Sequence, residues 1–378
     1  MAGRGLEGVV AAQTALSHVY GDEGRLIYRG YQIQDLAEEV SFEETCHLLW
    51  FGELPSQSQL EKLKQQLNQE ASVDQRVFDA LRAVGANAHP MTLLLAGVAE
   101  IAALDPDAEE MAAEANLRKA IRLTAQSLTL TAGIARIQAG QSPVAPRPSA
   151  SLAENFLYML RGEVSDELSV RMIDVALTLH AEHGMNASTF AARVAAGTLT
   201  DLHSAVIAAM ATLKGPLHGG ANEQVMEMLE QIGSADRADQ WVRDALARGD
   251  KVMGFGHRIY KTTDPRAPIL KRLAEQYNAQ NGQKSEWLQV SERIQATMRE
   301  EMDKKGKKVY PNVDFFSASV YSTLGIPKRL FTNVFACARM AGWTAHILEQ
   351  FADNRLIRPQ SEYTGPAERP VPPRSSRS

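Results

Sequence analysis

The stretch KVMGFGHRIYKTTDPRAPILK, residues 251–271, combines features of a site that handles a negatively charged substrate. His257 follows two glycines, and Arg258, Lys261 and Arg266 come within the next ten residues. Glycine beside a histidine lets a substrate approach the ring closely. Arginine can hold a planar carboxylate through two parallel hydrogen bonds. A histidine of the protein core needs neither feature, so the pattern indicates acid–base chemistry on a molecule that carries carboxylates.

Three further segments place a titratable side chain beside glycine or at the end of an apolar helix. They are HAEHGMNAST at 180–189, KGPLHGGANE at 214–223 and YPNVDFFSAS at 310–319. A single histidine is more often a core or surface group, but helix ends converge on clefts, where free backbone N–H groups meet ligands. The segments together therefore favour one site that contains His183, His218 and Asp314.

A metal site is the first alternative. His180 and His183 are three residues apart and could share a helical face, but the spacing is not that of the metallopeptidase helix. Cys46 and Cys337 lack metal-ligand spacing, and we expect both to be buried thiols. The chain also contains neither a nucleophile elbow nor a glycine-rich phosphate loop. We therefore expect no metal and no covalent nucleophile.

These side chains must be positioned by helices, because the pattern is helical nearly throughout. Ser41 with Glu44 and Ser151 with Glu154 predict capping boxes. An apolar stripe predicts a helix over 165–183 that carries His183, and 201–215 reads as a helix buried on all sides. Further helices are expected at 222–232, 236–247, 265–279, 285–304, 313–324 and 327–352. With no run of alternating strands, the sequence predicts an all-α protein.

The totals limit the class of protein. A chain of 378 residues suggests two domains, and 44% hydrophobic with 22% charged residues is typical of a soluble globular protein. The net charge of -5 argues against a nucleic-acid binder. No apolar run could span a bilayer, and the first residues lack a signal pattern, so we expect a cytoplasmic protein. The Pro- and Ser-rich stretches 139–151 and 365–378 are expected to be a connector and a solvated tail.

The motifs resemble those of the citrate synthase family, in its short bacterial and archaeal form, from Gly5 to about Gly365. The most specific is GFGHRIYKTTDPR. LKGPLHGGANE, PNVDFFS, HAEHGMNAST and RLIRPQSEYTG match further family blocks in the same order. The resemblance implies a homodimer of two-domain helical subunits, with a large domain at 1–219 and 326–378 and a smaller closing domain at 220–325.

The resemblance also implies the reaction that opens the tricarboxylic acid cycle. Acetyl-CoA condenses with oxaloacetate, and hydrolysis of the thioester then gives citrate and coenzyme A. Asp314 would remove a proton from the acetyl methyl group, His218 would donate a hydrogen bond to the thioester oxygen, and His257 would polarise the ketone of oxaloacetate. The groups that hold the two carboxylates would be His183, Arg266, Arg339 and, reaching across from the partner subunit, Arg358.

Coenzyme A would be a co-substrate, with no permanently bound cofactor. Arg258 and Lys261 are candidates for its phosphates. The backbone that could recognise its adenine belongs to Lys251, Val252, Met253, Gly254 and Phe255. Because the first family block begins after only four residues, we expect neither the N-terminal β-rich extension of the hexameric type nor its inhibition by NADH.

Two other functions compete with citrate synthesis. A 2-methylcitrate synthase would resemble the same motifs and use propionyl-CoA. A non-catalytic helical interaction protein would be expected to have lost His218, His257 or Asp314, and all three are present.

Overall fold

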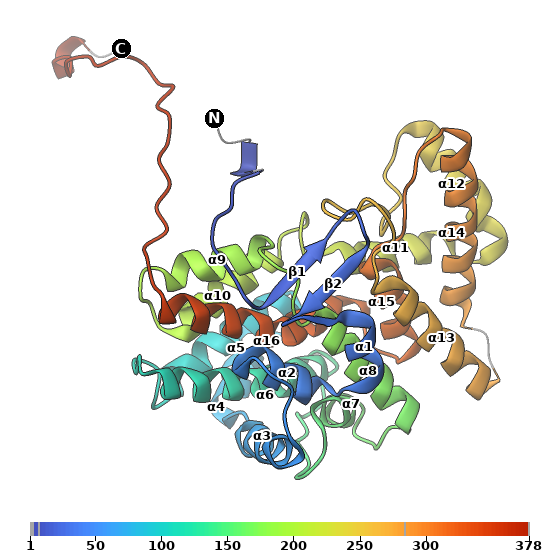
Figure 1. Cartoon of the computed structure of the whole chain (residues 1–378), viewed down its shortest axis with the longest axis horizontal. Coiled ribbons are helices and arrows are strands. Elements are labelled where there is room, and N and C mark those ends of the chain that lie inside the picture. Colours follow the sequence, from blue (N-terminus) through green and yellow to red (C-terminus); the bar gives the residue numbers. More distant parts are fainter. Residues whose placement is uncertain (1–3, 7, 283–284, 377–378) are drawn as a thin grey trace.

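The computed structural model describes residues 4–6, 8–282 and 285–376. This part of the chain contains sixteen α-helices, three short 3-10 helices and a three-stranded sheet (Figure 1). The α-helices are α1 (Ile33–Glu39), α2 (Phe42–Phe51), α3 (Gln57–Glu70), α4 (Gln75–Val84), α5 (Pro90–Leu104), α6 (Ala113–Gln138), α7 (Leu152–Arg161), α8 (Glu167–His180), α9 (Ala187–Ala196), α10 (Leu202–Leu213), α11 (Ala221–Ile232), α12 (Ala235–Arg248), α13 (Ala267–Asn281), α14 (Glu286–Lys304), α15 (Val313–Thr323) and α16 (Phe331–Ala352). The 3-10 helices are η1 (Arg4–Leu6), η2 (Lys328–Leu330) and η3 (Arg374–Ser376).

Helix α16 is the central element. Every residue from Phe331 to Ile347 is buried, and the helix packs against α2, α5, α6, α8, α9, α10 and α11. A helix with apolar residues all round is stable only when other elements enclose it. The surrounding helices therefore fix α16, and with it the side chain of Arg339, inside the protein.

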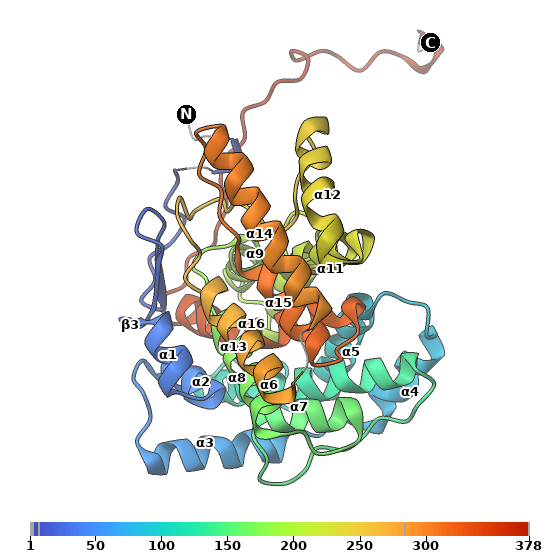
Figure 2. The ribbon, with the colours of Figure 1, turned by 90° about the vertical axis from the view of Figure 1, so that its right-hand side faces the viewer.

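Helices α11 to α15 form a second group. α12 packs against α14, α13 against α15, and α11 against α12, α14 and α15. Figures 1 and 2 show α12 and α14 at one end of the molecule and α3 at the other. The group reaches the remaining helices chiefly where α13 meets α8 and α11 meets α16. These helices fall within the range predicted for the smaller domain, whose boundaries stay a prediction.

The all-α prediction is confirmed except for a small antiparallel sheet that it missed. The sheet contains β1 (Ser17–Tyr20), β2 (Arg25–Tyr28) and β3 (Tyr31–Gln32), in that order. Ser17 pairs with Tyr28 and Tyr20 with Arg25. Strands of four, four and two residues are too short to establish a visible alternation. The available signal was the pair of glycines at 21 and 24 between two short apolar segments.

The helix predicted for 165–183 ends three residues early, at His180. Tyr28 from β2 explains the early end, because its hydroxyl donates to the carbonyl oxygen of Glu182 at 2.7 Å and accepts from the N–H of the same residue at 3.2 Å. These bonds hold the chain out of the helix, and Gly184 continues it with a positive φ of 60°. His183 therefore lies in a loop and not on the predicted helical stripe.

The sequence predicted that the helix within 201–215 is buried on all sides, and this prediction is wrong for the single chain. Within the single chain, Ser204 and Ala211 are exposed, and Ile207 and Ala208 between them are half-buried. The helix thus buries one face and leaves the other, mostly apolar, face open.

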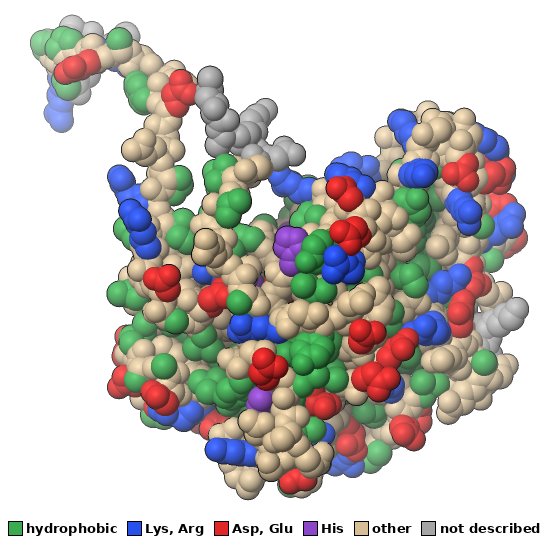
Figure 3. All heavy atoms as spheres, viewed as in Figure 1, with side chains coloured by type: hydrophobic (Ala, Val, Ile, Leu, Met, Phe, Trp, Pro, Cys, Tyr) green, Lys and Arg blue, Asp and Glu red, His purple; other side chains and the backbone are tan. Residues whose placement is uncertain are grey.

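Several local predictions are confirmed. Ser41 forms both bonds of its capping box, and Cys46 and Cys337 are buried free thiols. Ser151 makes only one of its two expected bonds, because the Glu154 carboxylate pairs with Arg147 instead. None of the described helices is both long and apolar enough to cross a membrane. On the face seen in Figure 3, acidic and basic side chains are interspersed.

Candidate active site

The loop that carries His257 is fixed to the start of α15, which carries Asp314. The N–H of Asn312 donates to the carbonyl oxygen of Gly254 at 2.9 Å, and its side-chain amide donates to that of Gly256 at 3.0 Å. Both glycines have φ near 80°, a conformation that strains other residues. These bonds join two segments more than fifty residues apart, so the two side chains keep a fixed relation.

His257 is held as a neutral hydrogen-bond donor. Its Nδ1 accepts from the backbone N–H groups of Ile259 at 3.0 Å and Tyr260 at 3.1 Å. Burial, with the nearby charge of Arg266, lowers its pKa to about 4. At neutral pH the ring proton therefore lies on Nε2, which is free to donate to a substrate oxygen.

His183 and Tyr260 complete a cluster of three rings. Nε2 of His183 lies 3.1 Å from the Tyr260 hydroxyl, and the centroids of the His183 and His257 rings are 5.3 Å apart. Burial lowers the pKa of His183 well below its usual value. Both histidines were predicted as site residues. Tyr260 was not, although it lies in the same motif, three residues after His257.

Arg266 forms a buried ion pair with Asp264. Its Nε and Nη2 donate to the two carboxylate oxygens of Asp264 at 3.0 and 2.8 Å. The same carboxylate accepts from the N–H of Val313 at 3.2 Å, at the start of α15. Arg266 was predicted to bind the substrate, whereas Asp264 was not predicted as its partner. Because Asp264 neutralises Arg266, this arginine adds a directed donor to the site and little net charge.

Arg339 is a buried cation without an ion pair among the described residues. It is 2% exposed, and its Nε donates to the carbonyl oxygen of His180 at 2.7 Å. Its Nη1 has no hydrogen-bond partner within the described chain, and the guanidinium lies over the Phe335 ring at 4.8 Å. Burial lowers its pKa to about 10. A buried charge in this state is costly until an anion meets it.

His218 is oriented by the start of α9. Its Nε2 accepts from the backbone N–H of Ser188 at 3.3 Å and lies 2.8 Å from the Ser188 hydroxyl. The ring proton therefore lies on Nδ1. Burial, with the charge of Arg339, lowers the pKa to about 4, so this ring too is a neutral donor. Ser188 was not predicted as a site residue. It follows Asn186, whose side chain caps α9.

Asp314 is a carboxylate whose pKa lies close to neutral pH. Its side chain has no hydrogen bond or ion pair with any described residue. Burial raises its pKa to about 6, and the charges of Arg266 and Arg339 oppose that rise. The buried rings of Phe315 and Phe316 follow it in α15. A carboxylate with this pKa is ionised at neutral pH and remains a stronger base than one in water.

The charged residues predicted to bind coenzyme A, and Arg358, lie on the surface of the single chain. Lys251, Arg258 and Lys261 are exposed, and Nζ of Lys261 donates to the carbonyl oxygen of Arg258 at 3.3 Å. Arg358 is exposed on the extended segment after α16 and makes no hydrogen bond or ion pair with the described residues. Within one chain, the structure therefore does not bring Arg358 to the other candidates.

The arrangement combines a base with two fixed neutral donors. Such a site can remove a proton next to a carbonyl group while a donor stabilises the charge that develops on the oxygen. The unpaired Arg339 would attract a carboxylate of the second reactant. Across the described ranges, no group of three or more His, Cys, Asp or Glu side chains is placed to hold a metal ion.

The chain matches a protein-family model described as "Citrate synthase, C-terminal domain" over residues 5–360. It is 49% identical over 364 residues to "Citrate synthase 2" of Bacillus subtilis, with 96% of each protein covered. It is 41% identical over 370 residues to a 2-methylcitrate synthase of Mycobacterium tuberculosis, covering 98% of this chain and 92% of that protein. Among solved structures, it resembles the ternary complex of Thermoplasma acidophilum citrate synthase with carboxymethyl coenzyme A and oxaloacetate. That similarity has a TM-score of 0.92 at 33% identity and covers 99% of both chains.

The unpaired charge of Arg339 predicts that small dicarboxylates stabilise the protein. At a ligand concentration of about 100 times Kd, the free energy of unfolding should rise by roughly 2.7 kcal/mol. Thermal unfolding would be followed with oxaloacetate and with the neutral diamide of succinate. Arg339→Met fills a similar volume without the charge, and it should remove the effect of the dianion. A full stabilisation of this variant by oxaloacetate would show that Arg339 is not the anion site.

Proposed function

The chain belongs to the citrate synthase family, and on that premise we propose that it condenses acetyl-CoA with oxaloacetate and water to give citrate and coenzyme A. This is the entry step of the tricarboxylic acid cycle. The observation that carries the proposal is Asp314, a carboxylate with a raised pKa and no partner in the described chain, at the start of a helix that is hydrogen-bonded to the loop of His257. We further propose that the enzyme is cytoplasmic and needs neither a metal nor a permanently bound cofactor.

In the first step, Asp314 removes a proton from the methyl group of acetyl-CoA. A carboxylate in water is far too weak for this, so the negative charge on the thioester oxygen must be stabilised as it forms. The Nδ1–H of His218 is the donor for that oxygen, and one such donor contributes about 3–4 kcal/mol. Since His218 stays neutral, it adds no positive charge that would weaken Asp314 as a base.

In the second step, the enol carbon attacks the ketone carbon of oxaloacetate and forms the new carbon–carbon bond. The Nε2–H of His257 polarises the ketone and supplies a proton to its oxygen. Arg266, Arg339 and His183 hold the two carboxylates. Water then adds to the thioester carbonyl, and the coenzyme A thiol leaves as citrate forms.

Coenzyme A itself would lie along the rim of the loop. Arg258 and Lys261 are exposed cations that can meet its phosphates. The backbone of residues 251–255 would recognise the adenine. Their position beside His257 would direct the thioester end of the molecule toward His218 and Asp314.

We propose a large domain at 1–219 and 326–378 and a small domain at 220–325. His257, Arg266 and Asp314 belong to the second, and His183 and Arg339 to the first. A dianion held by both would draw the domains together and exclude water before the enol forms.

We also propose a homodimer in which Arg358 completes the site of the partner subunit. Two features of the single chain support it. Arg358 has no partner within its own described chain, and α10 leaves the apolar face of Ile207, Ala208 and Ala211 uncovered. A second copy could cover this face, because symmetric homodimers bury the same surface of both subunits.

The second candidate function is 2-methylcitrate synthesis, which the name of the mycobacterial relative favours. Propionyl-CoA carries one more methylene than acetyl-CoA, and a difference of that size changes binding by only about 1–3 kcal/mol. We expect both thioesters to react, with the higher kcat/KM for acetyl-CoA. Steady-state kinetics with each thioester and oxaloacetate, followed by free thiol release, measure this ratio. A higher kcat/KM for propionyl-CoA would assign the chain to 2-methylcitrate synthesis, and no thiol release with either would refute the proposed function.

Asp314→Asn should lower kcat by at least about 100-fold, because the amide keeps the size of the side chain but cannot accept the proton. Affinity for oxaloacetate should change little. In the unaltered enzyme, Asp314 must be ionised to act, so kcat/KM should be constant above the pKa of about 6 and fall as the pH drops through it. Asp303→Asn changes an exposed aspartate and is the control. A normal kcat for Asp314→Asn would place the base elsewhere.

Mixed dimers test the role of Arg358. Arg358→Gln and Asp314→Asn should each be nearly inactive as homodimers. If Arg358 acts across the interface, one site of a mixed dimer has both intact groups. Random mixing should then restore about a quarter of the normal activity, since half of the dimers are mixed and each has one good site. If Arg358 acts within its own chain, mixing the variants restores nothing.

A further inference from the structure

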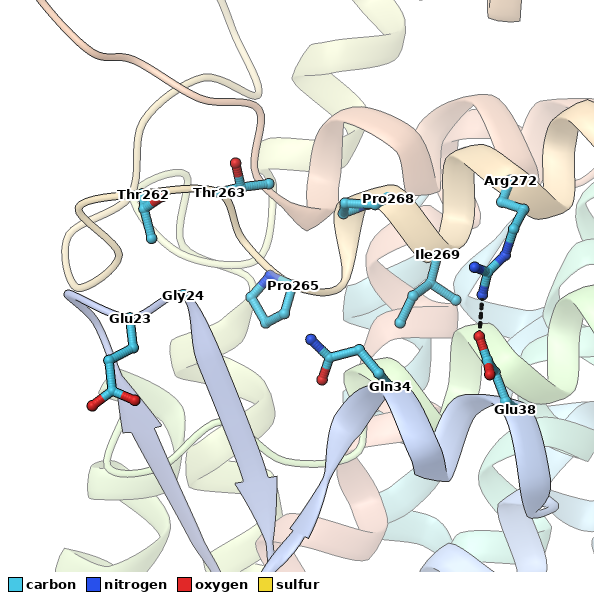
Figure 4. Close-up of a pocket in the computed structure, with 10 residues that line it drawn as sticks. All are labelled: Glu23, Gly24, Gln34, Glu38, Thr262, Thr263, Pro265, Pro268, Ile269 and Arg272. Carbon is cyan, nitrogen blue, oxygen red and sulfur yellow. Dashed lines mark hydrogen bonds and ion pairs between the residues drawn. The ribbon is translucent and has the colours of Figure 1, made fainter.

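The turn between β1 and β2 lies directly against the loop that carries His257. The N–H of Lys261 donates to the carbonyl oxygen of Gly21 at 2.9 Å. A Cβ atom on Gly21 would collide with the carbonyl oxygen of Ile259, and one on Gly24 would lie 2.7 Å from that of Thr263. Figure 4 shows Glu23 and Gly24 of the turn beside Thr262 and Thr263. The absence of side chains at the two glycines therefore permits the close approach.

The contact with Gly21 reaches His257 through one residue. The Ile259 carbonyl that faces Gly21 belongs to the same peptide group as the N–H of Tyr260. Ile259 and Tyr260 provide the two N–H groups that bond Nδ1 of His257. The Tyr260 side chain also meets His183. A shift of this short segment would thus disturb both the tautomer and the direction of the His257 ring.

Beside the turn, a groove separates the loop from α1, and Glu23 and Gly24 of the turn line it. It has a volume of about 330 Å³ and lies between α1 and the segment from Thr262 to Arg272 (Figure 4). Across it, Arg272 donates to Glu38 at 2.6 Å, but both side chains are more than half exposed, and such a pair contributes little. The contacts at Gly21 and Gly24 therefore hold the loop more closely than the pair of Arg272 and Glu38 does.

We propose that Gly21 is a positioning residue for His257, and that the β1–β2 turn is the surface on which the catalytic loop is seated. The inference rests on the proposed function in assigning His257 to the ketone of oxaloacetate. It adds a role for the small sheet beyond the bonds of Tyr28 to Glu182 after α8. Any side chain at position 21 would push Ile259 away and leave Nδ1 of His257 without its fixed donors.

Gly21→Ala should lower kcat by about 10- to 100-fold, the cost of misplacing a reacting group by about an ångström. Asp22→Ala alters an exposed residue of the same turn and should leave kcat unchanged. Gly24→Asn offers a second variant, since asparagine tolerates the φ of 63° but would press on Thr262 and Thr263. Its control is Gly30→Asn, in the other turn of the sheet, where nothing lies within 4 Å.

A readout independent of activity is the ¹⁵N NMR signal of the His257 ring, assigned by its loss in His257→Gln. The unaltered protein should show the neutral tautomer with the proton on Nε2, and so should both controls. Gly21→Ala and Gly24→Asn should shift this signal while thermal unfolding stays cooperative. Folded variants with a normal kcat and an unshifted signal would overturn the inference, as would an equal loss in Gly30→Asn. If the unaltered enzyme released no thiol from either thioester, the proposed function would fail, while the NMR comparison would still decide whether Gly21 positions the ring.

Discussion

The site depends on one constraint, the burial of the Arg339 guanidinium in the middle of α16. Removing a cation from water without an ion pair costs several kcal/mol, and only the packing of seven surrounding helices keeps the group in place. This explains why so much helical structure is needed for a reaction that uses few side chains. Helix α16 thus holds a cation without a direct ion pair inside the protein, and other residues of the predicted site surround it.

The same exclusion of water adjusts the other groups. Burial raises the pKa of Asp314 to about 6 and lowers those of His218 and His257 to about 4. In each case burial disfavours the charged form, so one environment yields an effective base and two neutral donors. The two histidines also take opposite tautomers, because backbone N–H groups meet Nδ1 of His257 and Nε2 of His218. Among the residues that the structure describes, no carboxylate accepts a hydrogen bond from either ring, and such a partner would have favoured imidazolium.

Most features that depend on residues close together in the sequence could be predicted, whereas those that depend on distant residues could not. The start of α15 and the place of Asp314 just inside it come from local signals, namely Asn312 as the cap and the apolar run that follows. Arg339 was recognisable as an arginine inside an apolar helix. The partners Asp264 and Tyr260 lie within a quoted motif, but nothing local indicated that one would pair with Arg266 and the other with His183. The end of α8 could not be foreseen, because it is decided by Tyr28, about 150 residues away. The strands were too short to leave a periodic pattern.

Charge balance supports the proposal that a second subunit contributes to the site. Asp264 neutralises Arg266, so Arg339 is the one buried arginine of the predicted set that has no direct ion pair among the described residues, although the charge of the buried Glu182 acts on it. Oxaloacetate has two negative charges, and Asp314 must carry a third at the moment when it acts as a base. One cation in a site closed to water would leave a net negative charge, which would raise the pKa of Asp314 further and oppose binding of the substrate. A second, unpaired cation would offset this charge. The exposed Arg358, without a partner in its own described chain, is the residue that we propose supplies it from a second subunit.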